Sequence, residues 1–517
     1  MSRRTLVGAL VLVLLFAVVA LGTALISLRT DSREVVIGAQ TTTVRTTFDG
    51  YATIDLGPLL PRLRLQEDLP LRLGVDIDVG ESVSDATSIE ALIQQNAVIA
   101  SQPAGEIATV RATLREMILD AVVRGLGAGV LAALAALVAW RLVGAERRAQ
   151  LRATLGARLR ERSPRSLLTA GAGLLVAALA VSALVVPYGH ASVTEEEWVP
   201  AVDLLPNAGF TGRLATIEVA KGAATSGSLA IIEGAIETYN ASVTFYGELL
   251  EAVPQQGFRA PDEDETVALL VSDRHDNIGM DPVSRAIGDA GGATVLITAG
   301  DDTSTGGSWE VFSISSLADA FEGYDVVAAA GNHDTGTAVV DAYRDAGFTV
   351  LEGEPTEVAG IRFLGDHDPR SSGLTAGYTE GEESVAEQGS RLASVACEDG
   401  EVSTLVVHSP STGEAVAESG CVDLVVSGHL HRQVGPDTVM GDNGEPTAVY
   451  TNGTTGGAAY AFALGSKLRR DAQVTLLTYR DGRPVGLQPV TITPGGEVVP
   501  ADYVELPAPE NLSGARR

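Results

Sequence analysis

Five short polar blocks between residues 273 and 431 combine aspartate, asparagine and histidine in a pattern that could hold metal ions. They contain five of the seven histidines in a chain of 517 residues. Each block follows a short apolar run, and such runs are typical of buried parallel strands. Open α/β sheets place their ligands at the carboxyl ends of these strands. In chain order the blocks are Asp273-Arg274-His275, Gly300-Asp301-Asp302, Gly331-Asn332-His333-Asp334, His408 and Gly428-His429-Leu430-His431.

The residue types in these blocks indicate phosphoester chemistry. Carboxylate oxygens, imidazole nitrogens and an amide carbonyl are good ligands for borderline divalent metals. One aspartate between two sets of such ligands can bridge two ions. Two ions about 3.5–4 Å apart can clamp a phosphate and activate a water for in-line attack. A histidine outside the ligand set can then protonate the leaving oxygen.

The ordered motifs resemble those of the calcineurin-like metallophosphoesterase superfamily over roughly residues 266–480. The resemblance implies an α/β domain built as a two-sheet αββα sandwich, in a membrane-anchored member of bacterial type. It implies a metal-dependent phosphoric ester hydrolase with two divalent ions, for which manganese, iron and zinc all suit the ligands.

The resemblance also implies a role for each motif residue. Asp301 would bridge the two ions, and His333 would be the general acid or a transition-state stabiliser. Asp334 would support the site and orient His333. The first metal would be held by Asp273, His275 and His431, and the second by Asn332, His408 and His429.

Four further features of this region leave two interpretations open. Arg274 could contact a phosphate oxygen bidentately, or form a surface salt bridge. Asp302 is either a third carboxylate near the metals or a turn residue. His367 could be a further metal ligand, but it lies outside the family motifs, and we expect a loop residue there. The segment 452–457, rich in glycine and threonine, could meet the substrate or form a simple turn.

Charge is distributed unevenly along the chain. The net charge is −30, while residues 191–517 alone hold 50 acidic and 17 basic residues, a balance of −33. An acidic domain argues against nucleic acid as a partner. It does not exclude a phosphate substrate, because two bound cations would reverse the local sign.

Three apolar stretches predict membrane spans. Residues 5–28 follow Arg3 and Arg4 and are uncharged, a length that favours an uncleaved anchor over a signal peptide. Residues 141–165 hold eight arginines and two glutamates, and such loops stay cytoplasmic. An acidic-lipid or nucleic-acid site is the secondary interpretation of this loop.

These spans predict a multi-pass protein of the cell membrane with its catalytic domain outside the cytoplasm. The predicted segments are a first transmembrane helix (1–28), a β-rich extracytoplasmic domain (29–116), a second transmembrane helix (117–143), an arginine-rich loop (144–165), a third transmembrane helix (166–188), a connector with a long helix (189–265), the metallophosphoesterase domain (266–480), and a C-terminal strand with a disordered tail (481–517).

Local signals add three expectations. Asp49-Gly50 between two alternating runs predicts a β-hairpin. Apolar spacing over 229–253 predicts a long helix. Cys397 and Cys421 are the only cysteines, and outside the cytoplasm such a pair favours a disulfide over two free thiols.

Taken together, the sequence favours a membrane-anchored dinuclear-metal phosphoesterase that uses metal-activated water on a phosphate mono- or diester. The expected partners are a small phosphoester or an envelope phospho-substrate and the lipid bilayer, without nucleic acid. The alternative function is a catalytically silent metal-binding sensor or scaffold of the cell envelope.

Overall fold

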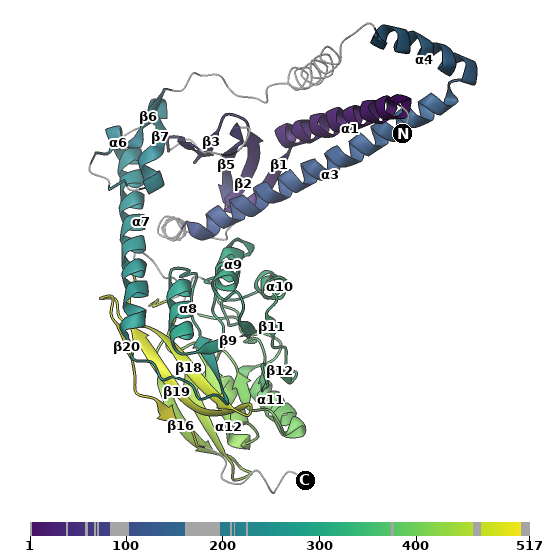
Figure 1. Cartoon of the computed structure of the whole chain (residues 1–517). Coiled ribbons are helices and arrows are strands. Elements are labelled where there is room, and N and C mark those ends of the chain that lie inside the picture. The colour runs from purple at the N-terminus through teal and green to yellow at the C-terminus, as the bar shows by residue number, and fades with distance from the viewer. Residues whose placement is uncertain are drawn as a thin grey trace.

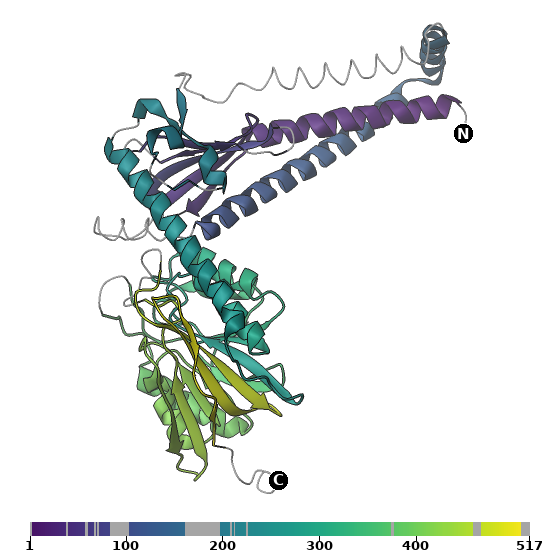
Figure 2. The same ribbon diagram turned by 60° about the vertical axis from the view of Figure 1, so that its left-hand side comes forward.

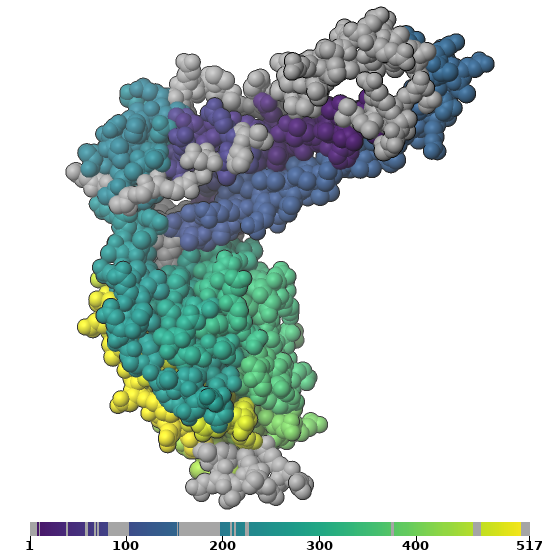
Figure 3. All heavy atoms as spheres, in the orientation of Figure 1, coloured from purple at the N-terminus to yellow at the C-terminus, as the bar shows by residue number. Residues whose placement is uncertain are grey.

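A computed structural model describes most of the chain (Figure 1). The described residues are 3–37, 40–56, 60–66, 69, 72–82, 103–160, 197–206, 209–210, 212–223, 226–373, 377–458 and 467–507. They form a pair of long helices, a β-sheet next to it and an α/β domain. Figure 3 shows the helix pair projecting to one side of the α/β domain.

The two long helices are α1 (Arg3–Thr30) and α3 (Ala104–Leu142), which pack side by side. Glycines allow the close approach, because a Cβ at Gly125 would lie 2.4 Å from the carbonyl oxygen of Ala20. The outer face of α3 exposes leucine and valine. Both helices are long and apolar enough to cross a membrane, which is consistent with membrane association. A polar helix, α4 (Ala145–Arg160), follows, and the third predicted span lies outside the described residues.

A seven-stranded sheet adjoins the helix pair, in the order β1-β2-β5-β3-β4-β7-β6. Its core includes Val44, Val75 and Ile77, which pack with Met117 of α3. Five strands precede α3, and two follow it, the first of them starting 56 residues after α3 ends. The bounds are β1 Ser32–Ile37, β2 Gln40–Thr47, β3 Tyr51–Asp55, β4 Leu63–Gln66, β5 Gly74–Ser82, β6 Trp198–Pro200 and β7 Ile217–Ala220.

The predicted hairpin at Asp49-Gly50 is wrong. Strand β5 lies between β2 and β3, pairing antiparallel with β2 and parallel with β3. Asp49 instead shapes a bend, where its Oδ1 accepts hydrogen bonds from Thr47 Oγ1 at 2.8 Å and from the Tyr51 amide at 3.0 Å.

The long helix α7 (Ser226–Ala252) joins the sheet to the α/β domain (Figure 2), as its apolar spacing predicts. Phe245, Tyr246 and Leu249 at its end pack into the core of that domain. The short elements around it are α6 (Ala201–Leu204) and the 3-10 turns η2 (Gly212–Thr216), η3 (Lys221–Ala223) and η4 (Val253–Gln255).

The α/β domain contains two sheets that pack face to face, so the predicted α/β class is confirmed. Leu270 and Ile297 of the first sheet share one core with Phe363 and Val426 of the second. The first runs β11-β10-β9-β8-β18-β19-β20 with β21 beside β19, and the second β12-β13-β14-β15-β17-β16. The bounds are β8 Glu265–Val271, β9 Ala293–Thr298, β10 Asp325–Ala328, β11 Thr349–Val350, β12 Thr356–Val358, β13 Ile361–Gly365, β14 Thr404–Val406, β15 Leu424–Ser427, β16 Val434–Met440, β17 Pro446–Thr451, β18 Ala472–Arg480, β19 Arg483–Ile492, β20 Val498–Pro500 and β21 Val504–Glu505.

Helices cover the outer faces of both sheets. Residues of α8 (Met280–Ala290), α9 (Val311–Ala320) and α10 (Thr337–Asp345) share a core with the first sheet. Residues of α11 (Val385–Asp399) and α12 (Pro410–Ser419) do so with the second. The predicted disulfide is confirmed: Cys397 in α11 is bonded to Cys421 just after α12, with Cα atoms 5.0 Å apart.

Candidate dinuclear metal centre

The polar blocks meet where strands of both sheets end. Strands β8, β9 and β10 run parallel in the first sheet, and β14 and β15 run parallel in the second. The loops after these five strands carry the aspartates, the asparagine and the histidines. The face-to-face packing of the sheets therefore brings together residues that lie up to 158 positions apart, from Asp273 to His431.

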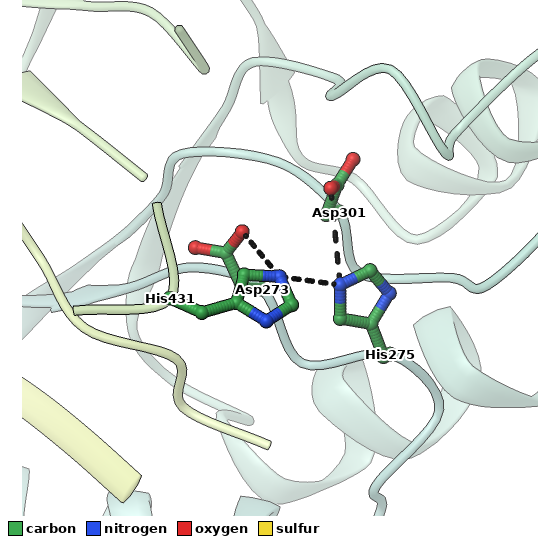
Figure 4. A group of neighbouring side chains, drawn as sticks. All are labelled: Asp273, His275, Asp301 and His431. Carbon is green, nitrogen blue, oxygen red and sulfur yellow. Dashed lines mark hydrogen bonds and ion pairs between the residues drawn. The ribbon is translucent and has the colours of Figure 1, made fainter. Parts of the chain in front are cut away.

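Four of these side chains form a first cluster (Figure 4). One ligand atom from each of Asp273, His275, Asp301 and His431 lies within 4.8 Å of the others. The Nε2 atoms of His275 and His431 face each other at 3.0 Å. His431 Nε2 also lies 3.3 Å from Asp273 Oδ1. Such inward-facing donor atoms are what a bound cation requires.

Asp301 belongs to a second cluster as well. Its Oδ2 lies 3.1 Å from His408 Nε2, and His408 Nε2 lies 3.2 Å from His429 Nδ1. The two clusters thus share one carboxylate, which is the arrangement of a bridging ligand between two ions.

Asn332 supplies an observation of its own in favour of a metal. Its Nδ2 donates to Ser372 Oγ at 2.8 Å. Its Oδ1 is buried and has no hydrogen-bond partner in the described part of the chain. A buried carbonyl oxygen left without a partner is costly, and coordination of a cation would satisfy it. The residues present therefore fit two divalent ions.

Backbone carbonyls hold three of the imidazole rings. Because a carbonyl oxygen only accepts, the Nδ1 atom facing it carries the proton, which leaves Nε2 free to bind a metal. His275 Nδ1 donates to Thr303 at 3.2 Å, His408 Nδ1 to Ala299 at 2.7 Å and His431 Nδ1 to Ala458 at 3.1 Å.

The backbone of the site is strained. Six residues other than glycine adopt positive φ there, a conformation that costs on the order of 1–3 kcal/mol each. Neighbouring glycines make room for this packing: a Cβ at Gly331 would lie 2.3 Å from Asp301 Oδ1. The strained residues are Asp273, His275, Asp276, Asp301, His429 and His431, with φ between 45° and 70°.

The electrostatic field of the site attracts positive charge. Burial lowers the pKa of His275 to about 3, and burial together with His408 lowers the pKa of His429 to about 4. Burial also acts to lower the pKa of His408, but the charges of Asp301 and Asp273 outweigh it and raise that pKa to about 10. The carboxylates thus stabilise a cation between them.

His333 lies beside the first cluster without belonging to it. Its ring centroid is 5.2 Å from that of His275, and its amide donates to Asp301 Oδ1 at 2.8 Å. Its Nδ1 donates to the carbonyl oxygen of Ser304 at 2.8 Å. No described residue forms a hydrogen bond with its Nε2, which is therefore open to a substrate.

The predicted phosphate contact of Arg274 is wrong, and so is the alternative of a surface salt bridge. The guanidinium is fully buried and donates to both carboxylate oxygens of Asp281 at 2.7 Å and to Asp302 Oδ1 at 3.2 Å. Asp302 also accepts hydrogen bonds from Thr298 and Tyr343 at 2.7 Å. The two residues form a buried structural network.

Asp334 does not orient the ring of His333, a role that the Ser304 carbonyl fills. Its carboxylate accepts hydrogen bonds from the amides of Gly331 and Thr303, both at 2.9 Å. Burial and the charges of Asp302 and Asp301 raise its pKa to about 7. Asp334 therefore joins two loops of the site to each other.

His367 lies in a loop, as expected, where its Nδ1 accepts from the amide of Ala330 at 3.4 Å. The segment 452–457 uses its polar groups to hold the loop of Asp273. Thr454 Oγ1 donates to the Asp273 carbonyl at 2.7 Å, and the Gly456 amide donates to the same oxygen at 3.1 Å.

Sequence reasoning missed Arg370, which lies two residues before Ser372, the partner of Asn332. Asp368 holds the guanidinium through Nε at 2.9 Å and Nη2 at 2.7 Å. The charge of Arg370 contributes to the low pKa of His429, so the guanidinium acts on the second cluster. The sequence signal that could have identified Arg370 is its position two residues after the run Asp366-His367-Asp368.

Comparison with known families agrees with this geometry. Residues 267–433 match the calcineurin-like phosphoesterase family. This part of the chain is therefore a calcineurin-like metallophosphoesterase domain, the domain of a metal-dependent phosphoric ester hydrolase.

Solved structures with low similarity were also found. An archaeal phosphodiesterase is 16% identical and covers 47% of this chain and 100% of its own, with a TM-score of 0.27. A protein of Thermus thermophilus is 12% identical and covers 42% of this chain and 99% of its own, with a TM-score of 0.30. No curated protein matched the chain. The assignment rests on the family match and on the arrangement of the ligands.

Proposed function

We propose that the chain is a membrane-anchored, extracytoplasmic phosphoesterase with two divalent ions that hydrolyses a phosphate mono- or diester. The sharing of Asp301 between two ligand clusters carries this proposal. Asp273, His275 and His431 would hold one ion, and Asn332, His408 and His429 the other. When bound, two such ions polarise the phosphate oxygens and activate a water.

His333 is proposed as the general acid. Its Nδ1 proton is committed to the Ser304 carbonyl, so the proton delivered to the leaving oxygen comes from Nε2. The ring must therefore be doubly protonated before it acts, and it returns to the Nδ1–H form afterwards.

Arg370 is proposed to contact the phosphate in place of Arg274. Two of its nitrogens are held by Asp368, and its side chain is only 10% exposed. No described residue pairs with Nη1, which is therefore available for a phosphate oxygen. The ring of Tyr378 lies 5.1 Å from the guanidinium, within the range of a cation–π contact.

Three observations support the proposed placement outside the cytoplasm. The described part of the chain has two helices long enough to cross a membrane, an arginine-rich segment follows the second, and the catalytic domain holds a disulfide, which is typical of oxidising compartments. This placement favours an envelope phospho-substrate or a small phosphoester.

The experiment that tests the proposal measures metal content and turnover in the purified full chain. We expect two divalent ions per chain and hydrolysis of nitrophenyl phosphate or bis-nitrophenyl phosphate. Asp345→Ala, at an exposed position of α10 away from the ligands, serves as the control and should match the wild type. Bound metal without turnover of either ester would favour the silent sensor instead.

A further inference from the structure

A hydrophobic contact joins the α/β domain to β1 and to the start of α3, which we call the membrane-proximal part of the chain. Trp309 and Phe312 pack with Ile278 of the same domain and with Val36 of β1. The start of α3 reaches the same place, because a Cβ at Gly105 would lie only 2.6 Å from Phe312 Cδ2. Figures 1 and 2 both place the start of α3 next to α9. The contact therefore joins a candidate membrane helix directly to the catalytic domain.

Between Trp309 and Phe312 lies a buried carboxylate that shapes the adjoining loop. Glu310, in the 3-10 turn η5 (Ser308–Glu310), is fully buried. It accepts hydrogen bonds from the amides of Ser304 at 3.1 Å, Thr305 at 2.9 Å and Gly307 at 2.7 Å. One side chain thus fixes the backbone of residues 304–307, which we call the 304–307 turn.

The 304–307 turn also holds the ring of His333. The carbonyl oxygen of Ser304 accepts the Nδ1 proton of the His333 ring at 2.8 Å. The carbonyl oxygen of Thr305 accepts from Thr335 Oγ1 at 2.9 Å. Gly306 has φ +73°, and a Cβ there would lie 2.3 Å from the Thr335 amide. The turn is therefore fitted closely against the backbone that follows His333.

We propose that Glu310 is a positioning residue for His333, and that the contact of Trp309 and Phe312 with β1 and α3 keeps it in place. The membrane-proximal part of the chain would then set the orientation of the proton donor without touching the metal ligands. This inference rests on the proposed function of His333 as the general acid. It assigns a role in catalysis to the N-terminal half of the chain, beyond anchoring.

The first test is Glu310→Gln in the full chain. Glutamine has nearly the same size as glutamate. Its side-chain NH2 group is a donor, however, and cannot accept the hydrogen bonds that the backbone amides of the 304–307 turn give to Glu310. We expect normal metal content and turnover of an alkyl phosphate lower by about 10-fold, a part of the roughly 10²–10⁴ that a general acid contributes. Turnover of nitrophenyl phosphate should change little, because nitrophenolate leaves without protonation.

Combining the variant with His333→Ala decides whether Glu310 acts through His333. If it does, Glu310→Gln has no further effect once His333 is gone, since coupled residues are not additive. An equal loss in both backgrounds, or a loss of metal, would overturn the inference. His333→Ala alone distinguishes a failure of the Glu310 proposal from a failure of the general-acid proposal. If this variant loses the same fraction of turnover for good and poor leaving groups, the general-acid proposal itself fails.

The second test addresses the contact with α3 and does not depend on how Glu310→Gln folds. Gly105→Leu places a side chain against Phe312, whereas Gly127→Leu in the same helix is a matched control, because no atom lies within 4 Å of a Cβ at that position. We expect Gly105→Leu to slow alkyl phosphate turnover several-fold while nitrophenyl phosphate turnover and metal content stay normal. Equal behaviour of the two variants on both substrates would refute the role of this contact.

Discussion

Replacing Arg274 by methionine should destabilise the catalytic domain strongly. Arg274 is fully buried between Asp281 and Asp302, which are also buried, with side-chain exposures of 1% and 0%. Methionine fills a similar volume but leaves two carboxylates without their cation. Breaking a buried ion pair by removing one partner costs about 3–5 kcal/mol. At about 2–4 °C per kcal/mol for a domain of this size, Tm should fall on the order of 10 °C.

The assay is thermal unfolding of the full chain, monitored by circular dichroism. Arg344→Met is the matched control, because Arg344 pairs with Asp341 and Glu352 at the surface with 47% exposure. Exposed pairs contribute about 0.2–1 kcal/mol, so this variant should unfold close to the wild type. If Arg274→Met is as stable as the control and instead raises KM for the phosphoester, Arg274 contacts the substrate and does not form the buried network with Asp281 and Asp302.

Three other predictions follow from the site, the disulfide and the proposed topology. Arg370→Ala should raise KM for a phosphoester at unchanged metal content, and an unchanged KM would exclude Arg370 as a phosphate ligand. Replacing Cys397 and Cys421 by alanine should lower the free energy of unfolding by about 3 kcal/mol, a model-dependent value for a loop of this length; peptide mapping of the exported protein that finds both thiols free would contradict the bridge. In intact cells, an impermeant thiol reagent should label a cysteine placed at Leu60 and spare one at Leu155, and labelling at Leu155 would refute the topology.

The ligand clusters could be predicted because scarce residues recur at strand ends in a fixed order. Short β-branched runs identify buried strands, and parallel strands bring their carboxyl ends to one edge of a sheet. Asp273, His275, Asp301, His408, His429 and His431 meet as that rule requires.

The side-chain orientation of Arg274 could not be predicted from the sequence. Asp273 and His275 both face the first cluster, and Arg274 between them faces the opposite side, where Asp281 and Asp302 surround it. These carboxylates lie 7 and 28 positions away, and no local pattern reveals such a distant pair.

Two other features depend on contacts without a sequence signature. The Ser304 carbonyl that orients His333 is a backbone atom, which any residue type could provide. The Asp49-Gly50 signal was overridden by tertiary pairing, because β5 inserts between the two strands that this turn would have joined. Turn chemistry decides strand pairing only when no third strand competes.

In the proposed phosphoesterase, Asp301 joins two metal ions and His333 is the proton donor. The most direct measurement compares metal content and turnover for Asp301→Ala and His333→Ala, using an alkyl phosphate and nitrophenyl phosphate. Asp301→Ala should lose metal and activity together. His333→Ala should keep its metals and lose roughly 10²–10⁴ in turnover of the alkyl ester, with a much smaller loss for the nitrophenyl ester. Normal metal content in Asp301→Ala, or loss of the metals in His333→Ala, would contradict the account.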